Sequence, residues 1–185
     1  MIVSAHNGYP NWLNSGADFM EVDIRRTPRE VIVLAHDALQ PNRKYVELDE
    51  VLGAACGKIG LQLDLKELGY EDVLLTRVLE RCAPDRVVVT TDRSDALRHI
   101  KHVHPDVKAG LTRRNVEETD FDFLCLDHSF VDDDALDFCL QRDIAVWLWT
   151  VDSLRQMRRF FDDGRIAGLI TNRPDRALAL RRARS

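Results

Sequence analysis

The stretch Phe19-Met20-Glu21-Val22-Asp23-Ile24 decides how this chain folds. Glu21 and Asp23 are two positions apart, so in a β-strand their side chains point to the same face. Residues 27–30, Thr-Pro-Arg-Glu, have the composition of a tight turn with proline at its second position. We therefore expect a hairpin in which residues 31–36 return alongside the first strand.

The register of this hairpin would determine which side chains meet. If Pro28 and Arg29 are the two central residues of the turn, Glu21 lies opposite His36, with Cβ atoms about 4.5–5.5 Å apart. Asp23 lies on the same face. The hairpin thus predicts a polar site and not part of a hydrophobic core.

Apolar runs alternate with helical patterns through the remaining chain. Strands are expected at residues 2–5, 19–25, 31–36, 59–66, 86–90, 107–111, 123–126, 144–151 and 166–171, and helices at 47–56, 70–82, 94–102, 132–141, 154–161 and 175–182. Strands and helices joined by short links are typical of parallel βα units. The return strand of the hairpin is the odd member of nine. The remaining eight predict an α/β fold, a compact (β/α)8 TIM-type barrel formed by a single domain at residues 1–185.

Composition excludes several classes of function. The net charge of −5 and the pI of about 5.7 give no basic surface for nucleic acid or an anionic membrane. No apolar run approaches the roughly 20 residues of a membrane span, so no stable membrane insertion is expected. The start of the chain shows no charged-then-apolar signal region.

The cysteines show no paired spacing. They are Cys56, Cys82, Cys125 and Cys139. We expect small buried hydrophobic side chains in a reducing compartment, with neither a disulfide nor a zinc site. A cytoplasmic location follows from this interpretation and from the missing signal region.

Polar residues collect where the predicted strands end. They are His6, Glu21 with Asp23, Asp64 with Lys66, Asp92, Asp127-His128, Trp149-Thr150 and Thr171-Asn172. In TIM-type barrels the chemistry is carried at the carboxyl ends of the strands. Several acids and histidines at the ends of the first strands therefore indicate an active site.

Three of these acids form a candidate metal site. Glu21, Asp23 and Asp64 offer hard oxygen ligands, which suit one divalent cation, Mg²⁺ or Ca²⁺, better than zinc. A divalent ion beside two histidines and a lysine fits attack on a phosphate ester. The metal neutralises phosphate oxygens while one imidazole takes a proton and the other donates one.

Each residue also has a simpler interpretation when taken alone. Asp64 and Lys66 could form a surface ion pair, and Glu-x-Asp on a strand is commonly a solvated face. Asp127-His128 lies at a strand end but has no assigned partner. Trp147 is expected in the core, whereas Trp149 at the end of its strand could form a wall of the pocket. Only their occurrence together, at the ends of successive strands, favours a functional site over these simpler interpretations.

These residues resemble the motifs of the glycerophosphodiester phosphodiesterase family and, in part, of the sphingomyelinase D type phospholipases. The matching segments are Ala5-His6-Asn7-Gly8, Gly16 to Asp23, Val33-Leu34-Ala35-His36-Asp37, Leu63-Asp64-Leu65-Lys66, Trp149-Thr150-Val151-Asp152 and Gly168 to Pro174. They occur in the family's order over nearly the whole chain. The resemblance implies a barrel of the phosphatidylinositol phospholipase type. It also implies His6 and His36 as catalytic acid and base, Glu21, Asp23 and Asp64 as metal ligands, and Lys66 and Trp149 as phosphate and substrate contacts.

The chain departs from this family at several positions. Asn7 replaces the arginine that contacts phosphate in the hydrolases, so we expect Asn7 among the substrate or phosphate contacts. An amide cannot supply the charge or the paired donors of a guanidinium. Asp64 stands where the hydrolases usually have glutamate, which is closer to the sphingomyelinase D pattern. Only 14 residues separate His6 from Glu21, so the first barrel helix is trimmed. The segment after His36 has no room for an insertion domain.

The sequence therefore predicts a metal-dependent phosphodiesterase. It would hydrolyse a small glycerophosphodiester-like substrate to an alcohol and a phosphomonoester. One alternative is a lyase-like reaction in which a neighbouring substrate hydroxyl attacks and a cyclic phosphate leaves. Others are a non-catalytic binding homologue, suggested by Asn7, and a structural or assembly protein.

Overall fold

Eight parallel strands close into a barrel, which confirms the predicted fold class. The computed structural model describes residues 1–184, so of the predicted domain only Ser185 lies outside the described residues. The strands are β1 (Ile2–Ala5), β2 (Phe19–Arg26), β3 (Ile32–Leu34), β4 (Gly60–Leu65), β5 (Val87–Thr91), β6 (Lys108–Arg113), β7 (Phe123–Asp127), β8 (Val146–Trp149) and β9 (Ile166–Thr171). Around the barrel the order is β1-β2-β4-β5-β6-β7-β8-β9, and β1 pairs with both β9 and β2. Strand β3 pairs antiparallel with the end of β2.

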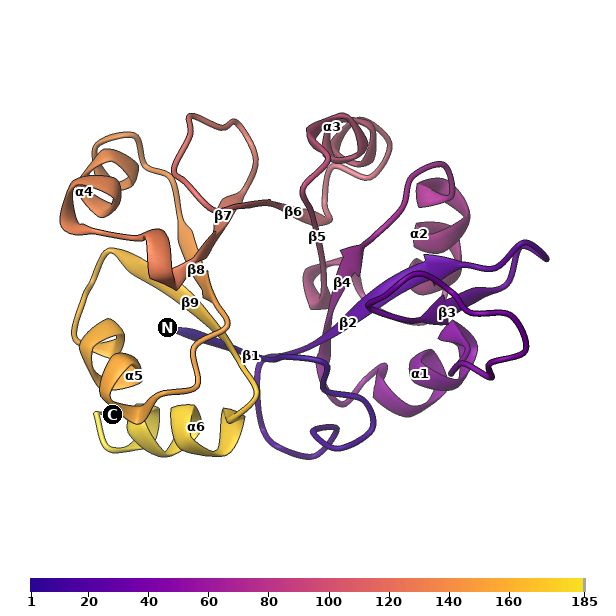
Figure 1. Ribbon diagram of the computed structural model, residues 1–185, viewed down its shortest axis with the longest axis horizontal. Coiled ribbons are helices and arrows are strands. Elements are labelled where there is room, and N and C mark those ends of the chain that lie inside the picture. The colour runs from indigo at the N-terminus through magenta and orange to yellow at the C-terminus, as the bar shows by residue number, and fades with distance from the viewer. Residues whose placement is uncertain (185) are drawn as a thin grey trace.

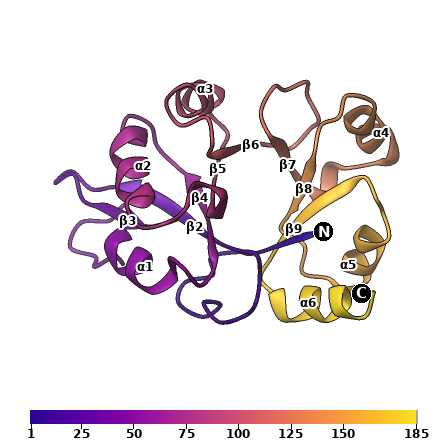
Figure 2. The same cartoon turned by 180° about the vertical axis from the view of Figure 1, so that it is seen from behind.

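Helices surround the barrel (Figures 1 and 2). They are α1 (Leu48–Ala55), α2 (Glu71–Leu79), α3 (Ser94–Val103), α4 (Asp133–Gln141), α5 (Leu154–Phe161) and α6 (Pro174–Arg182), with short 3₁₀ turns at Pro84–Arg86 and His128–Phe130. Within the described residues, the β1–β2 and β6–β7 connections contain no helix. The β1–β2 connection is the place where a trimmed first helix was expected. Its loop runs between α6 and α1 in Figure 1. No described helix has the length and apolar character that crossing a membrane requires.

Strand β2 shows how alternation divides the barrel into two faces. Met20, Val22 and Ile24 belong to the large apolar core, in which the strands pack against the helices. The alternate residues Glu21 and Asp23 are also buried, and they line the barrel interior. A strand buried on both faces therefore places two carboxylates inside the protein, where only a specific partner can offset their desolvation.

An aromatic plug, formed by Phe19, Phe123 and Trp147, fills the opposite end of the interior from these acids. Phe123 stacks on Trp147 with ring centroids 4.4 Å apart, and Phe19 lies 5.8 Å from Trp147. The rings lie so close to Gly110 and Gly168 that a Cβ atom at either glycine would meet a ring atom within 3.0 Å. The plug closes the barrel, so a ligand can approach the acids only from the carboxyl ends of the strands.

The predicted register of the hairpin is wrong by one residue. Ile24 pairs with Leu34 and Arg26 with Ile32, so Glu21 does not lie opposite His36. The turn contains an additional residue, because Glu30 adopts a positive φ of 62° and Val31 pairs with Thr27, whose N–H donates to the Val31 carbonyl at 2.8 Å. Such a three-residue loop, with its last residue left-handed, is a common hairpin connection.

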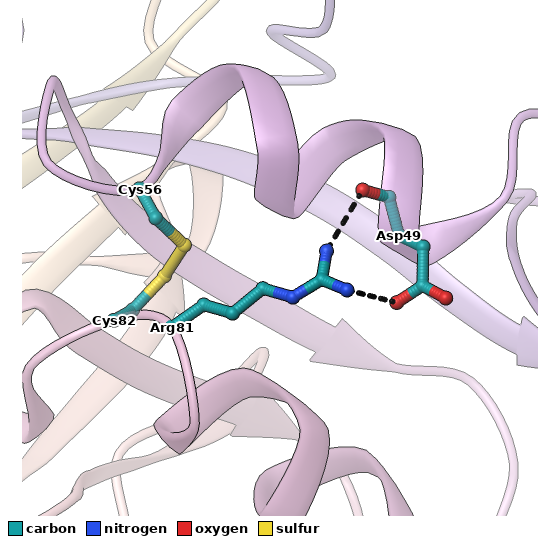
Figure 3. Close-up of a disulfide and its surroundings, with 4 residues drawn as sticks. All are labelled: Asp49, Cys56, Arg81 and Cys82. Atoms are coloured by element: carbon teal, nitrogen blue, oxygen red, sulfur yellow. Dashed lines mark hydrogen bonds and ion pairs between the residues drawn. A yellow bond between two sulfur atoms is a disulfide. The ribbon is translucent and has the colours of Figure 1, made fainter.

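A disulfide joins Cys56 to Cys82, so the prediction of four unpaired cysteines is wrong for this pair. Cys56 caps the end of α1 and Cys82 follows α2, so the bond joins the C-terminal ends of these two helices (Figure 3). Arg81 adds an ion pair to Asp49 of α1, with N and O atoms 3.7 Å apart. The cytoplasmic prediction rested partly on unpaired cysteines and loses that support, because disulfides are typical of oxidising compartments.

Candidate active site

A cavity of about 310 Å³ opens at the carboxyl ends of the strands. It is lined by His6, Glu21, Asp23, His36, Gln62, Asp64, Lys66, Thr112, Cys125, Trp149, Thr150 and Ile170. Of the eight residues for which the sequence predicted a role, seven are in this set; Asn7 lies beside it. Segments from the start, middle and end of the chain meet here because the barrel closes β9 onto β1.

The three predicted acids converge. Asp23 and Asp64 are register partners on β2 and β4, and Glu21 lies two residues earlier on the same face. One carboxylate oxygen from each lies within 4.8 Å of the others. Oδ2 of Asp23 is buried and has no hydrogen-bond partner among residues 1–184. An unpaired buried carboxylate oxygen is costly, and a bound cation would satisfy it, so the site fits a divalent metal.

Lys66 lies among these carboxylates. Its Nζ is 2.8 Å from Oδ1 of Asp23 and 2.5 Å from Oδ2 of Asp64. Burial lowers the pKa of Lys66, but the charges and hydrogen bonds of Asp64 and Asp23 outweigh it and raise that pKa above its usual value. With all three acids ionised, the cluster with Lys66 carries two net negative charges, which match a divalent cation.

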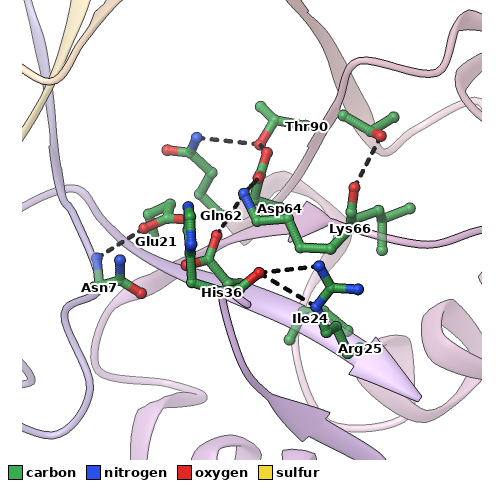
Figure 4. Close-up of polar contacts among 12 residues, drawn as sticks. Asn7, Glu21, Ile24, Arg25, His36, Gln62, Asp64, Lys66 and Thr90 are labelled. Carbon is green, nitrogen blue, oxygen red and sulfur yellow. Dashed lines mark hydrogen bonds and ion pairs between the residues drawn. The ribbon is translucent and has the colours of Figure 1, made fainter. Parts of the chain in front are cut away.

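A buried polar chain holds Asp64 in place. The Thr90 hydroxyl donates to Oδ1 of Asp64 at 2.7 Å, and Gln62 Nε2 donates to Thr90 Oγ1 at 3.3 Å. Ser4 Oγ in turn donates to Gln62 Oε1 at 2.7 Å. The chain of bonds crosses β1, β4 and β5, and Figure 4 shows its part from Gln62 through Thr90 to Asp64. Burial still raises the pKa of Asp64, despite the opposing contributions of Lys66 and Thr90.

Glu21 is held by the main chain of Asn7. The Asn7 N–H donates to Oε2 of Glu21 at 2.7 Å (Figure 4), and Asn7 adopts a left-handed φ of 44°, a conformation that asparagine tolerates well. Burial, together with the charges of Asp23 and Asp64, raises the pKa of Glu21 well above its ordinary value of 4.5. The residue at the position of the family's arginine thus orients a predicted metal ligand through its backbone.

His6 is oriented by a relay of two residues. Its Nδ1 lies 2.9 Å from Oδ1 of Asn172, and Nδ2 of Asn172 donates to Asp152 at 2.7 Å. A carboxylate only accepts hydrogen bonds, so the Asn172 amide turns its NH₂ group toward Asp152 and its oxygen toward His6. Nδ1 of His6 therefore carries the proton, and Nε2 keeps its lone pair.

The same relay fixes Asp152. Burial raises the pKa of Asp152, but hydrogen bonds from Asn172 and from the Thr171 hydroxyl outweigh it, so the pKa falls below its usual value. Asp152 thus remains ionised and keeps the amide of Asn172 in one orientation. No role had been predicted for this pair, although both residues lie within the segments that resemble the family.

His36 lies in the loop after β3 and is much more exposed, with 64% of its side chain accessible. Its Nδ1 is 3.1 Å from Oδ1 of Asp37. The same argument from an accepting carboxylate places the proton on Nδ1 and leaves Nε2 free. Nε2 of His6 has a long contact of 3.4 Å with Nδ2 of Asn7, which a ligand can replace. Both histidines can therefore present Nε2 to a ligand.

The wall opposite the acids is largely apolar. Trp149 lines it, and its indole Nε1 donates to the carbonyl of Cys125 at 3.1 Å, which fixes the ring plane. Trp147 belongs to the aromatic plug, as expected for a core residue. Asp127 and His128 are not among the described residues that line the cavity. Nδ1 of His128 instead lies 3.2 Å from Nε2 of Gln156.

Comparisons with known proteins identify the fold. No model of a protein family matches the chain, and neither does any curated protein. Solved structures do match over almost the full length. A glycerophosphodiester phosphodiesterase from Parabacteroides distasonis is 18% identical, with a TM-score of 0.83, covering 99% of this chain and 97% of that one.

Two further structures agree. A phosphodiesterase from Oleispira antarctica in complex with the product sn-glycerol-3-phosphate has 16% identity, a TM-score of 0.80 and coverage of 98% and 97% of the two chains. A glycerophosphodiester phosphodiesterase from Thermotoga maritima has 16% identity, a TM-score of 0.75 and the same coverage. Structures that share the predicted fold thus carry the name of the family that the motifs resemble. At this identity the likeness establishes the fold, and activity needs a separate argument.

Proposed function

We propose that this protein is a metal-dependent phosphodiesterase that hydrolyses a glycerophosphodiester-like substrate to an alcohol and a phosphomonoester. The observation that supports this most directly is the meeting of His6, His36, Lys66 and the three acids in one cavity. The solved structures that share this fold are named phosphodiesterases, which supports the same class of reaction for this protein.

In this proposal Glu21, Asp23 and Asp64 hold one divalent cation, Mg²⁺ or Ca²⁺. A bound cation neutralises phosphate oxygens and thereby favours attack at phosphorus. Lys66 adds a positive charge on the phosphate side of the cluster. Trp149 provides an apolar surface for the remaining part of the substrate.

The two histidines move the protons. One imidazole takes the proton of the attacking water through Nε2 as the new bond from oxygen to phosphorus forms. The other must start as an imidazolium, with a proton on both ring nitrogens, and gives the Nε2 proton to the alcohol oxygen as its bond to phosphorus breaks. The products are an alcohol and a phosphomonoester. The histidine that acted as base has gained one proton, and the histidine that acted as acid has lost one.

The direct test measures release of glycerol phosphate from a glycerophosphodiester, with Mg²⁺ or Ca²⁺ added and with chelator. We expect turnover that the chelator abolishes, and a loss of about 10²-fold or more in kcat for His6→Ala and His36→Ala. His99→Ala is the matched control, because His99 is an exposed histidine that pairs with Asp72 on the outer helices. Metal-dependent turnover that persists unchanged in His36→Ala would contradict the proposed roles.

Phosphorus NMR of the product separates hydrolysis from the lyase-like alternative. Hydrolysis gives a phosphomonoester signal at once, whereas a cyclic phosphate that accumulates and persists would show that a substrate hydroxyl attacks. Absence of turnover on every phosphodiester would favour the non-catalytic homologue. Calorimetric titration with Mg²⁺ and Ca²⁺ would identify the preferred ion, and cell fractionation would test the cytoplasmic location.

A further inference from the structure

Arg25 makes a bridge at the rim of the candidate site that the proposed reaction does not yet use. It lies near the end of β2, and only 16% of its side chain is exposed. Nε and Nη2 of Arg25 donate to the carbonyl oxygen of His36 at 3.2 and 3.0 Å (Figure 4). Nη1 donates to Oε1 of Glu67 at 2.6 Å.

His36 depends on such a contact because it lies outside regular structure. Strand β3 ends at Leu34, and the last ladder-like bond runs from the Ala35 N–H to the Asp23 carbonyl at 3.0 Å. The imidazole contacts Asp37, whose side chain is 91% exposed, so this contact cannot hold the loop. The two bonds from Arg25 reach the backbone of His36 itself.

The other end of the bridge lies beside the metal cluster. Glu67 directly follows Lys66, whose N–H donates to the Ile24 carbonyl at 3.2 Å. Glu67 also accepts from the Arg26 N–H at 3.4 Å. The guanidinium fork presents its donors in a fixed plane, so Arg25 sets the position of His36 relative to the segment that carries Lys66.

We propose that Arg25 is a positioning residue, which holds the His36 loop at the distance from the cluster that proton transfer requires. This proposal rests on the proposed function for the role of His36. Direct phosphate binding is the rival role for a cation here, given the missing arginine at Asn7. The structure favours positioning, because three donors of Arg25 are already engaged and Arg25 is absent from the described residues that line the cavity.

The kinetic test compares Arg25→Met with Arg26→Met. Arg26 is the matched control, because it is the adjacent arginine but pairs with Glu30 and lies over the Tyr70 ring, away from His36. A displacement of about 1 Å can cost about 10²-fold in rate. We expect Arg25→Met to lower kcat by about 10- to 100-fold, with KM changed less than about threefold, and Arg26→Met to leave both near the wild-type values.

Arg25→Lys is the conservative variant, which keeps the positive charge beside Glu67 and serves as the test if Arg25→Met does not fold. An ammonium group can reach the His36 carbonyl or Glu67 but cannot span both in one plane, so we expect an intermediate kcat. A raised KM with unchanged kcat would show that Arg25 binds phosphate and would overturn the proposal. So would an Arg25→Met variant no slower than Arg26→Met.

A second measurement does not depend on turnover. The N–H groups of Leu34 and Ala35, which lead into His36, donate to the carbonyls of Val46 and Asp23. Their amide hydrogen exchange reports whether this segment is held, and we expect at least about tenfold faster exchange in Arg25→Met than in Arg26→Met. If the wild-type protein cleaves no phosphodiester, the proposed function fails, and exchange alone decides the positioning role. Equal exchange in the two variants would overturn it.

Discussion

Replacing Asp152 by asparagine should reverse the tautomer of His6. In the wild-type protein the carboxylate accepts from Nδ2 of Asn172, which leaves the amide oxygen facing Nδ1 of His6. An amide at residue 152 can turn its own NH₂ group toward Asn172. The Asn172 amide would then rotate and offer its NH₂ group to His6, so Nδ1 would become the acceptor and Nε2 would carry the proton.

The magnitude follows from the bond that fixes the amide. A hydrogen bond to a charged group contributes about 1.5–3 kcal/mol, which is a preference of about 10- to 150-fold for the wild-type orientation. In Asp152→Asn the Thr171 hydroxyl and the Asn172 N–H hold the new amide oxygen at the Oδ1 position, so its NH₂ group faces Asn172 and the preference is reversed. A reversal of similar size lowers the fraction of His6 with an unprotonated Nε2 by up to that factor. We expect kcat to fall by about 10- to 100-fold in Asp152→Asn, and the ¹⁵N signals of the His6 ring to exchange their protonated and unprotonated positions.

A double exchange provides the control. In Asp152→Asn with Asn172→Asp, the new carboxylate at residue 172 accepts from Nδ1 of His6 and from the amide at residue 152, so the original tautomer should return. The backbone N–H of residue 172 and the Thr171 hydroxyl can still donate to the side-chain oxygen of residue 152. If Asp152→Asn leaves the ring signals and kcat unchanged, the relay does not control His6. Failure of the double exchange to restore the ring signals would refute the same reasoning.

Three further predictions concern stability. Cys56 and Cys82 are 26 residues apart, so reduction should lower the free energy of unfolding by about 3.5 kcal/mol in urea titrations, and the Cys56→Ala/Cys82→Ala variant should not respond to reductant. Gly110→Ala forces a methyl group into the aromatic plug and should cost about 1–3 kcal/mol, whereas Gly53→Ala, with open space around its Cβ position in α1, should not destabilise the protein. Because the folded-state pKa of Glu21 is raised, the metal-free protein should lose stability as pH rises above 4.5 and through the folded-state pKa. Added Mg²⁺ should therefore raise Tm more at about pH 8 than at about pH 5, and equal shifts would count against Glu21 as a ligand.

The barrel and the cluster of acids were predictable because both depend on local patterns. Alternation in β2 places Glu21 and Asp23 on one face whichever strand lies beside them. Parallel strands that all end at the same rim then bring Asp64 near. The prediction needed the order of the strands and the position of each acid, and the sequence contains both.

The hairpin register and the disulfide depended on conformations that the sequence pattern leaves open. Glu30 in a left-handed conformation adds one residue to the turn, although glutamate gives no indication of a positive φ. Cys56 and Cys82 meet because the ends of α1 and α2 lie side by side on the outside of β4. Two cysteines without paired spacing become partners only when that packing is known.

The relay to His6 and the bridge to His36 needed the closed barrel, and they show that the two histidines are held in different ways. His6 lies at the seam between β1 and β9, where Asn172 can fix its tautomer from within the structure. His36 lies in an exposed position after a short edge strand, and among the described residues its ring hydrogen-bonds to the exposed carboxylate of Asp37. Its loop is instead held through the backbone by Arg25. A change in the relay should therefore alter which nitrogen carries the proton, whereas a change in the bridge should alter where the imidazole lies. The first effect should appear in the ring signals of His6 without faster amide exchange, and the second in amide exchange around His36 without a change of tautomer at His6.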